Sequence, residues 1–176
     1  MDYNLCDYNT VKKILSAHGF NFSKAWGQNF IIDDSVCPTM AEMLEADEKT
    51  GVLEVGPGVG VLTKELCKRA GKVVSVELDE RLYPVLEQTL ADYDNFELVK
   101  GDVMKIDLKQ LIAEKFADCD TVKVCANLPY YITSPVIMML LQSRLPVSEI
   151  EVMVQQEAAE RLCAPIGSRE AGAVSV

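Results

Sequence analysis

The chain has 176 residues, with 27 Asp and Glu against 17 Lys and Arg, so its formal net charge is −10. This length fits one domain, and a hydrophobic fraction of 49% is ordinary for a globular core. We expect a cytoplasmic protein without membrane contact, because the chain has no long apolar run and no signal-peptide pattern. The acidic balance alone argues against nucleic acid, since phosphate binding needs clustered Lys and Arg.

The cysteines and the histidine limit the possible chemistry. The six cysteines are scattered, without a Cys-x-x-Cys pair or a zinc-like His spacing, so we expect free thiols and no metal. His18 is the single histidine. Ser-His-Asp and Cys-His catalysis are therefore excluded unless His18 takes part. Its position in an expected surface helix predicts a solvated side chain.

The N-terminal part is predicted to contain two helices joined by a loop. Apolar residues at helical spacing predict a helix over 8–19, which Gly19 would end. Residues 20–30 lack a period and are expected to form a loop. A second helix is expected over 34–46, with Asp33 or Asp34 as its cap. Its inward-facing side chains are expected to be Met40, Met43 and Leu44.

From residue 51 onward, strands and helices are predicted to alternate about five times. Strands are expected over 52–55, 72–76, 96–99, 121–126 and 150–154. Helices are expected over 61–70, 79–91, 108–116, 136–141 and 155–163. This alternation predicts an α/β fold, with a mostly parallel sheet that has helices on both faces. Ligands bind such sheets at the carboxyl ends of the strands, so site residues should follow strands.

A glycine-rich turn follows the first expected strand, with the sequence EVGPGVG at 54–60. The dinucleotide fingerprint GxGxxG fails in both registers, because its last glycine would fall on Val61 or Thr63. The spacing ExGxGxG is instead similar to the glycine motif of S-adenosylmethionine enzymes. In that motif the turn leaves room for the methionine part of the cofactor. The alternative is a tight turn that binds no ligand.

Two acidic residues follow the next two expected strands. Glu77 lies about 20 residues beyond the glycine turn, where a carboxylate can accept hydrogen bonds from a ribose diol. Asp79 is more simply the N-cap of the following helix. Asp102 follows the third strand and can accept from an adenine amino group, although a turn Asp is the alternative.

The segment Asn127-Leu128-Pro129-Tyr130 follows the fourth expected strand and matches the (N/D/S)-(I/L/P)-P-(Y/F/W) signature of amino-methyltransferases. An adenine amine is a poor nucleophile because its lone pair is delocalised into the ring. The Asn127 oxygen and the Leu128 carbonyl can both accept from this amine and free the lone pair. Pro129 would fix the backbone, and Tyr130 offers a stacking face for the base. These groups favour the transition state by positioning and electrostatics.

In this order, the motifs resemble the KsgA (RsmA-type) family of small-subunit rRNA adenine N6,N6-dimethyltransferases. The resemblance covers about residues 20–176 and includes the segments GQNFI at 27–31 and NLPYYITSP at 127–135. It implies a class I S-adenosylmethionine-dependent methyltransferase fold, which is Rossmann-like. The implied reaction is the N6-dimethylation of adenosines in a hairpin near the 3′ end of 16S rRNA, on the immature small ribosomal subunit.

The resemblance also implies roles for single residues. Asn29 and Ile31 would close over the cofactor, S-adenosyl-L-methionine. Gly56 and Gly58 would contact the methionine part. Glu77 would hold the ribose and Asp102 the adenine. Asn127 would hold the methyl-accepting amine beside the cofactor.

The resemblance further implies a domain organisation. Residues 1–32 would form an N-terminal helix and a cofactor-covering loop, and residues 33–176 the catalytic domain. The family continues beyond Val176 with the last strands and a helical domain, so we expect a truncated chain that acts as a monomer. We expect this chain to bind the cofactor but to transfer methyl groups to ribosomal RNA poorly or not at all. Ala171 stands where the family usually has Tyr. The missing region would normally supply part of the basic RNA surface.

Three rival functions remain open at this point. Large-subunit rRNA methyltransferases of the macrolide-resistance type share the motifs, although NLPYY and GQNF favour the small-subunit group. A non-catalytic RNA-binding relative is disfavoured by the intact segment at 127–130. A nicotinamide-dependent oxidoreductase is disfavoured by the glycine spacing.

Overall fold

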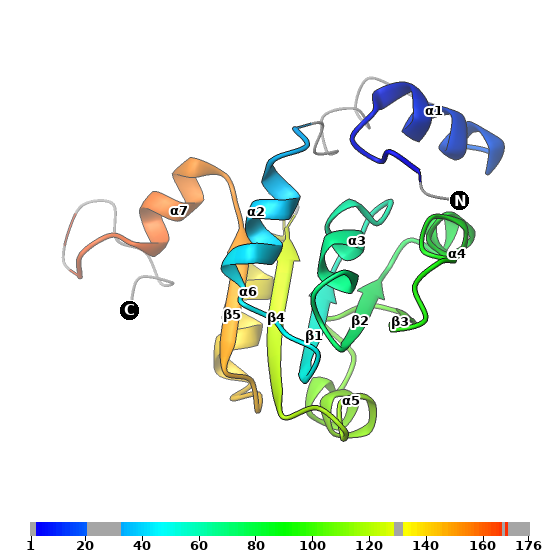
Figure 1. Cartoon of the computed structure of the whole chain (residues 1–176). Helices are drawn as coiled ribbons and strands as arrows, with labels where there is room; N and C mark the ends of the chain where they lie inside the picture. Colours follow the sequence, from blue (N-terminus) through cyan, green and yellow to red (C-terminus); the bar gives the residue numbers. More distant parts are fainter. Residues whose placement is uncertain (1–2, 21–32, 129–131, 167, 169–176) are drawn as a thin grey trace.

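The computed structural model describes residues 3–20, 33–128, 132–166 and 168 (Figure 1). Within these residues, one parallel sheet has the strand order β3-β2-β1-β4-β5. Its strands are β1 (Thr50–Val55), β2 (Lys72–Glu77), β3 (Phe96–Lys100), β4 (Thr121–Asn127) and β5 (Glu149–Met153). The helices are α1 (Tyr8–Ala17), α2 (Val36–Met43), α3 (Val61–Cys67), the 3-10 helix η1 (Glu80–Leu82), α4 (Tyr83–Thr89), α5 (Leu108–Lys115), α6 (Thr133–Gln142) and α7 (Gln156–Leu162).

Helices cover both faces of the sheet, as predicted. In Figure 1, α2 and α3 lie in front of the sheet and α6 lies behind it. Side chains of α2 and α3 form one core cluster with Val52, Val73 and Cys125 of the strands. Side chains of α5 and α6 pack in another cluster on the opposite face, which includes Leu53 and Val74. The alternating direction of strand side chains explains why neighbouring residues serve different clusters.

The strand order predicts a ligand site at the carboxyl ends of the central strands β1 and β4. The chain passes from β1 to β2 and β3 on one side, and then returns to β4 and β5 on the other side of β1. The order therefore reverses between β1 and β4, where crevices form outside the carboxyl ends of parallel strands. The predicted α/β fold with a parallel sheet is confirmed.

The start and end of α2 differ from the prediction. Ser35 is the N-cap residue and makes no capping bond through its side chain. The Asp33 carboxylate instead accepts from the Ser35 backbone N–H (2.9 Å) and hydroxyl (2.6 Å), so the predicted aspartate cap is wrong. Met43 is 65% exposed at the last position of the helix, so its predicted inward orientation is also wrong. Met40 and Leu44 are buried, as predicted.

The helix predicted over 79–91 is divided into η1 and α4. Asp79 caps η1, as predicted, by accepting from the Arg81 backbone N–H at 3.0 Å. Pro84 lies in the first turn of α4, where its missing N–H costs no helical hydrogen bond. The other predicted helices and strands agree with the structure, with ends that differ by up to three residues.

His18 does not have the solvated side chain that was predicted. It lies at the C-cap of α1, and its Nε2 is 2.7 Å from Oε1 of Gln88 on α4. The Gln88 amide in turn donates to the Tyr3 hydroxyl at 2.8 Å. Helix periodicity alone does not reveal such a contact, because Gln88 is distant in sequence.

Candidate functional site

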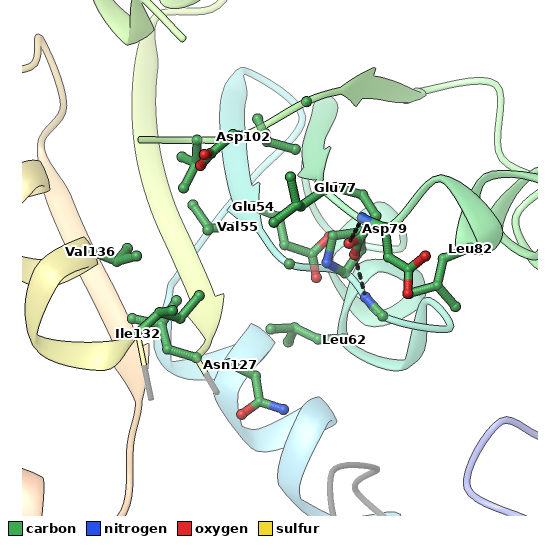
Figure 2. A pocket seen from close by; sticks show the side chains of 18 of the residues that line it. Glu54, Val55, Leu62, Glu77, Asp79, Leu82, Asp102, Asn127, Ile132 and Val136 are labelled. Atoms are coloured by element: carbon green, nitrogen blue, oxygen red, sulfur yellow. Dashed lines mark hydrogen bonds between the residues drawn. The ribbon is translucent and has the colours of Figure 1, made fainter. Parts of the chain in front are cut away.

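A cavity of about 700 Å³ opens at the carboxyl ends of β1, β2, β3 and β4 (Figure 2). Six of the predicted site residues line it, namely Gly56, Gly58, Glu77, Asp102, Asn127 and Leu128. The other predicted site residues are Asn29, Ile31, Pro129 and Tyr130, which lie outside the described residues. The topology therefore brings together site residues that are spread over more than seventy positions of the sequence.

The glycine turn after β1 combines an unusual backbone with open space. Gly56 and Gly58 have φ values of 70° and 60°, in the left-handed region that favours glycine. A Cβ atom at either position would meet no heavy atom within 4 Å. The Gly56 N–H donates to the Val76 carbonyl at 3.0 Å, which fixes the turn against β2. The backbone of this turn therefore forms a wall of the cavity that a ligand can approach closely.

Glu77 ends β2 with a buried side chain that lines the cavity. Its Oε1 accepts from the Asp79 N–H at 2.8 Å, and its Oε2 accepts from the Gly58 N–H at 3.4 Å. Burial raises the pKa of Glu77, and these backbone donors oppose the rise. A carboxylate oriented in this way retains acceptor capacity for a hydroxyl-bearing ligand.

Sequence reasoning assigned no role to Glu54, although its side chain is 1% exposed and lines the same cavity. Its Oε2 accepts from the hydroxyls of Thr63 (2.7 Å) and Ser75 (2.5 Å). Burial raises the pKa of Glu54 to about 7. The first position of the ExGxGxG spacing was the available signal, but this spacing does not say which way the side chain points.

In the part of the cavity beyond β2 and β3, two apolar side chains form the rim and one carboxylate lies next to them. Leu78 is 66% exposed and Met104 is 47% exposed, and both line the cavity. The Asp102 carboxylate accepts from the Met104 N–H at 3.0 Å, and Lys105 lies 3.6 Å from its other oxygen. Two exposed apolar side chains next to a carboxylate can bind a flat ring that carries an amino group.

The part of the cavity beyond β4 has a polar end and an apolar wall. Asn127 is the last residue of β4, and the buried Leu128 donates its N–H to the Met153 carbonyl at 3.2 Å. The wall is completed by Ile132, Pro135 and Val136 around the start of α6. Polar groups at the end of a strand, beside such a wall, can orient a base while water is kept away.

The described residues contain no group of three His, Cys, Asp or Glu side chains that could hold a metal ion. All six cysteines are free thiols. In the same part of the chain, no helix has both the length and the apolar character to span a membrane.

Comparison with known proteins assigns the family. Residues 19–176 match the sequence model of the ribosomal RNA adenine dimethylase family. The chain belongs to this family. The small subunit rRNA methyltransferase A of Bacillus licheniformis is 48% identical over 166 residues, which are 94% of this chain and 57% of the relative. The ribosomal RNA adenine dimethylase chain thus spans little more than half the length of the curated relatives it matches.

Solved structures of related enzymes share the fold. A dimethyladenosine transferase from Plasmodium falciparum is 28% identical, with a TM-score of 0.66 over 82% of this chain and 50% of its own. The 23S rRNA methyltransferase ErmE is 29% identical, with a TM-score of 0.60 over 73% of this chain and 49% of its own. The predicted resemblance to rRNA adenine dimethyltransferases is confirmed at the level of the family.

Proposed function

We propose that this chain binds S-adenosylmethionine and is the catalytic part of an enzyme that transfers methyl groups to N6 of adenosines in small-subunit rRNA. The observation that carries the proposal is one cavity that contains a glycine turn, Glu77, Asp102 and Asn127, each from the end of a different strand. The reaction consists of two successive methyl transfers to one amine. The proposed setting is the cytoplasm, with the protein acting as a monomer on the immature small subunit.

The residues present fit S-adenosylmethionine. The open space beside Gly56 and Gly58 suits the methionine part, and the Glu77 carboxylate suits the two ribose hydroxyls. Leu78 and Met104 would lie against the adenine ring, with Asp102 next to its amino group. When bound, this cofactor supplies a methyl group on a positively charged sulfur that is a good leaving group.

The residues beyond β4 would prepare the acceptor. The Asn127 side-chain oxygen and the Leu128 carbonyl would accept hydrogen bonds from the target amine, which localises its lone pair on nitrogen. The apolar wall of Ile132, Pro135 and Val136 would exclude water and strengthen these hydrogen bonds. We assign no general base, because the amine loses its proton after the methyl group has been transferred.

The small ribosomal subunit is proposed as the substrate because the curated relatives carry that name at 42–48% identity. The likeness to ErmE, named for 23S rRNA, makes the large subunit the second candidate. The net charge of −10 limits non-specific attraction to either RNA.

Two measurements test the proposal. Calorimetry should show binding of S-adenosylmethionine and no binding of NAD. Tritiated methyl transfer should favour immature small subunits over large subunits, with the Bacillus licheniformis relative as the positive control. If the chain binds the cofactor and neither the chain nor a full-length version transfers methyl groups, the catalytic half of the proposal fails. Binding of NAD instead would overturn both halves.

A further inference from the structure

Arg81 lies at the rim of the cavity and is paired with Asp79 through two side-chain hydrogen bonds. Its Nε donates to Asp79 Oδ1 at 2.8 Å, and its Nη2 donates to Oδ2 at 2.6 Å. Both residues line the cavity. A guanidinium that binds both oxygens of a carboxylate fixes its orientation, which a single contact does not do. This geometry distinguishes the pair from an ordinary exposed ion pair.

Asp79 connects this pair to Glu77. The Asp79 N–H donates to Glu77 Oε1 (Figure 2). The Asp79 side chain caps η1 and also holds the Arg81 guanidinium. The hydrogen bond from Arg81 lowers the pKa of Asp79, so this carboxylate stays ionised. The position of the Asp79 backbone therefore depends on both contacts of its side chain.

The other side of Arg81 faces the N-terminal helix. The Arg81 Cζ lies 5.3 Å from the centre of the Phe20 ring, within the range of a cation–π contact. Phe20 is buried in a core cluster that includes Ile14 and Leu15 of α1 and Leu86 of α4. Arg81 thus stands between the packing of α1 and the carboxylate that lines the cavity.

We infer that Arg81 is a positioning residue for the proposed cofactor site. Arg81 holds Glu77 in place through Asp79, and it links α1 to the site through Phe20. The inference rests on the proposed function, because it assumes that Glu77 binds the cofactor ribose. It adds a residue whose guanidinium need not touch the cofactor. Loss of Arg81 should weaken every ligand that carries the ribose.

Two ligands of different charge distinguish this positioning role from a purely electrostatic effect of Arg81. S-adenosylmethionine carries one more positive charge than S-adenosylhomocysteine, and both contain the same ribose. Removing a cation at the rim should, by Coulomb's law alone, strengthen binding of the positively charged ligand. Loss of positioning predicts the opposite result, namely a similar weakening for both ligands.

The pH dependence gives a second readout. The charged and titratable groups around Glu77 come from every element that packs beside it. They are Glu54 on β1, Asp79 at the N-cap of η1, Arg81 on η1, Tyr83 on α4, Lys100 opposite Glu77 on β3, and Asp102 after β3. If the Asp79 N–H moves away from Glu77 when Arg81 is absent, Glu77 loses a backbone hydrogen bond that lowers its pKa, and this pKa rises further. A protonated Glu77 is a poorer acceptor. The affinity of Arg81→Ala should therefore begin to fall at a higher pH than that of the wild type.

The test is calorimetry of S-adenosylmethionine and S-adenosylhomocysteine with the 176-residue chain between pH 6 and 8. Arg81→Ala should weaken both ligands about tenfold, and Arg81→Lys, which cannot bind both oxygens, about threefold. Asp79→Asn should resemble Arg81→Ala, and the double variant should be no weaker than the weaker single variant. Arg69→Ala is the matched control, because Arg69 pairs with Glu65 on α3 and does not line the cavity.

The outcomes separate the inference from the proposed function. Failure of the wild type to bind either ligand overturns the proposed function and, with it, this inference. Wild-type binding with unchanged affinity in both Arg81 variants overturns the inference alone, as does an equal loss in Arg69→Ala. If thermal unfolding shows that Arg81→Ala is destabilised, Arg81→Lys and Phe20→Leu decide the question. Phe20→Leu keeps an apolar side chain but removes the ring, and should weaken both ligands about twofold.

Discussion

Ser75 on β2 donates a hydrogen bond of 2.5 Å to the buried carboxylate of Glu54, its direct neighbour on β1. The same carboxylate oxygen accepts from the Thr63 hydroxyl. Desolvation is the main cause that raises the pKa of Glu54 to about 7, and the charge of Glu77 adds to it. The two hydroxyls oppose this rise, because they stabilise the ionised form. Glu54 therefore titrates near neutral pH.

This titration predicts a pH-dependent stability that Glu54→Gln should remove. The folded pKa lies above the ordinary value of 4.5, so the contribution is fully present below pH 4.5 and is lost as pH rises through about 7. The total is roughly 3 kcal/mol, at about 1.4 kcal/mol per pKa unit. Urea unfolding at pH 5, 6, 7 and 8 should show a smaller decline for Glu54→Gln than for the wild type. The exposed Glu157→Gln is the control, and parallel curves for wild type and Glu54→Gln would refute the assignment.

Alanine substitutions at two glycines should show that the effect on ligand affinity and the effect on stability have different causes. Gly58 and Gly19 both have positive φ values and open space around a Cβ, but only Gly58 lines the cavity. Alanine at either position should cost about 1–2 kcal/mol of stability, because the left-handed backbone is strained. Only Gly58→Ala should weaken S-adenosylmethionine, by about tenfold or more, because its methyl group enters the cavity. Thermal unfolding and calorimetry measure the two effects, and equal affinities for the two variants would contradict the assigned wall.

Glu77→Ala should weaken S-adenosylmethionine binding by about 1–3 kcal/mol, because ribose hydroxyls and the Gly58 N–H would lose their acceptor. Calorimetry measures the effect directly. Glu157→Ala on α7 provides a carboxylate deletion outside the cavity and should leave binding unchanged. An affinity that is unaffected by Glu77→Ala would remove this residue from the site.

Asn127→Ala should reduce methyl transfer while leaving cofactor affinity nearly unchanged, whereas Glu77→Ala should reduce cofactor affinity. Its proposed partner is the acceptor amine, so cofactor affinity should change little while methyl transfer falls by roughly two to three orders of magnitude. Single-turnover transfer to immature small subunits should be measured in a full-length relative with the matching substitution. Equal losses in binding and transfer would make Asn127 a cofactor residue and contradict the proposed mechanism.

RNA affinity of the 176-residue chain should be weak and only slightly salt-dependent. Lys12 and Lys13 are exposed on α1, and Lys24 lies outside the described residues. Two or three such charges predict a slope of roughly −2 to −3 for log affinity against log salt on duplex RNA. Filter retention across a salt series measures this slope, and Lys12→Ala with Lys13→Ala should reduce its magnitude by about 2. A slope much steeper than −3 would show that other cations form the RNA surface.

The residues that sequence patterns locate well are those that follow strands. Glu77, Asp102 and Asn127 were predicted to converge because the carboxyl ends of parallel strands meet at one edge, and the cavity contains all three. The contacts of Arg81 with Asp79 and Phe20 depend on side-chain geometry that no periodicity contains. Met43 was misplaced because the buried side of α2 is formed by Cys37, Met40, Ala41 and Leu44, and Met43 lies outside that side.

The cavity walls come from β1, β2, β3 and β4 and from the start of α6, so a ligand can bind only after distant parts of the chain have come together. Parallel strands pair through long crossovers, which makes such assembly slow compared with local helix formation. A ligand that binds only the folded state stabilises that state. At a free ligand concentration of 100 Kd, it adds about 2.7 kcal/mol to the free energy of unfolding. During synthesis, the supply of cofactor would thereby influence how much newly made protein survives proteolysis.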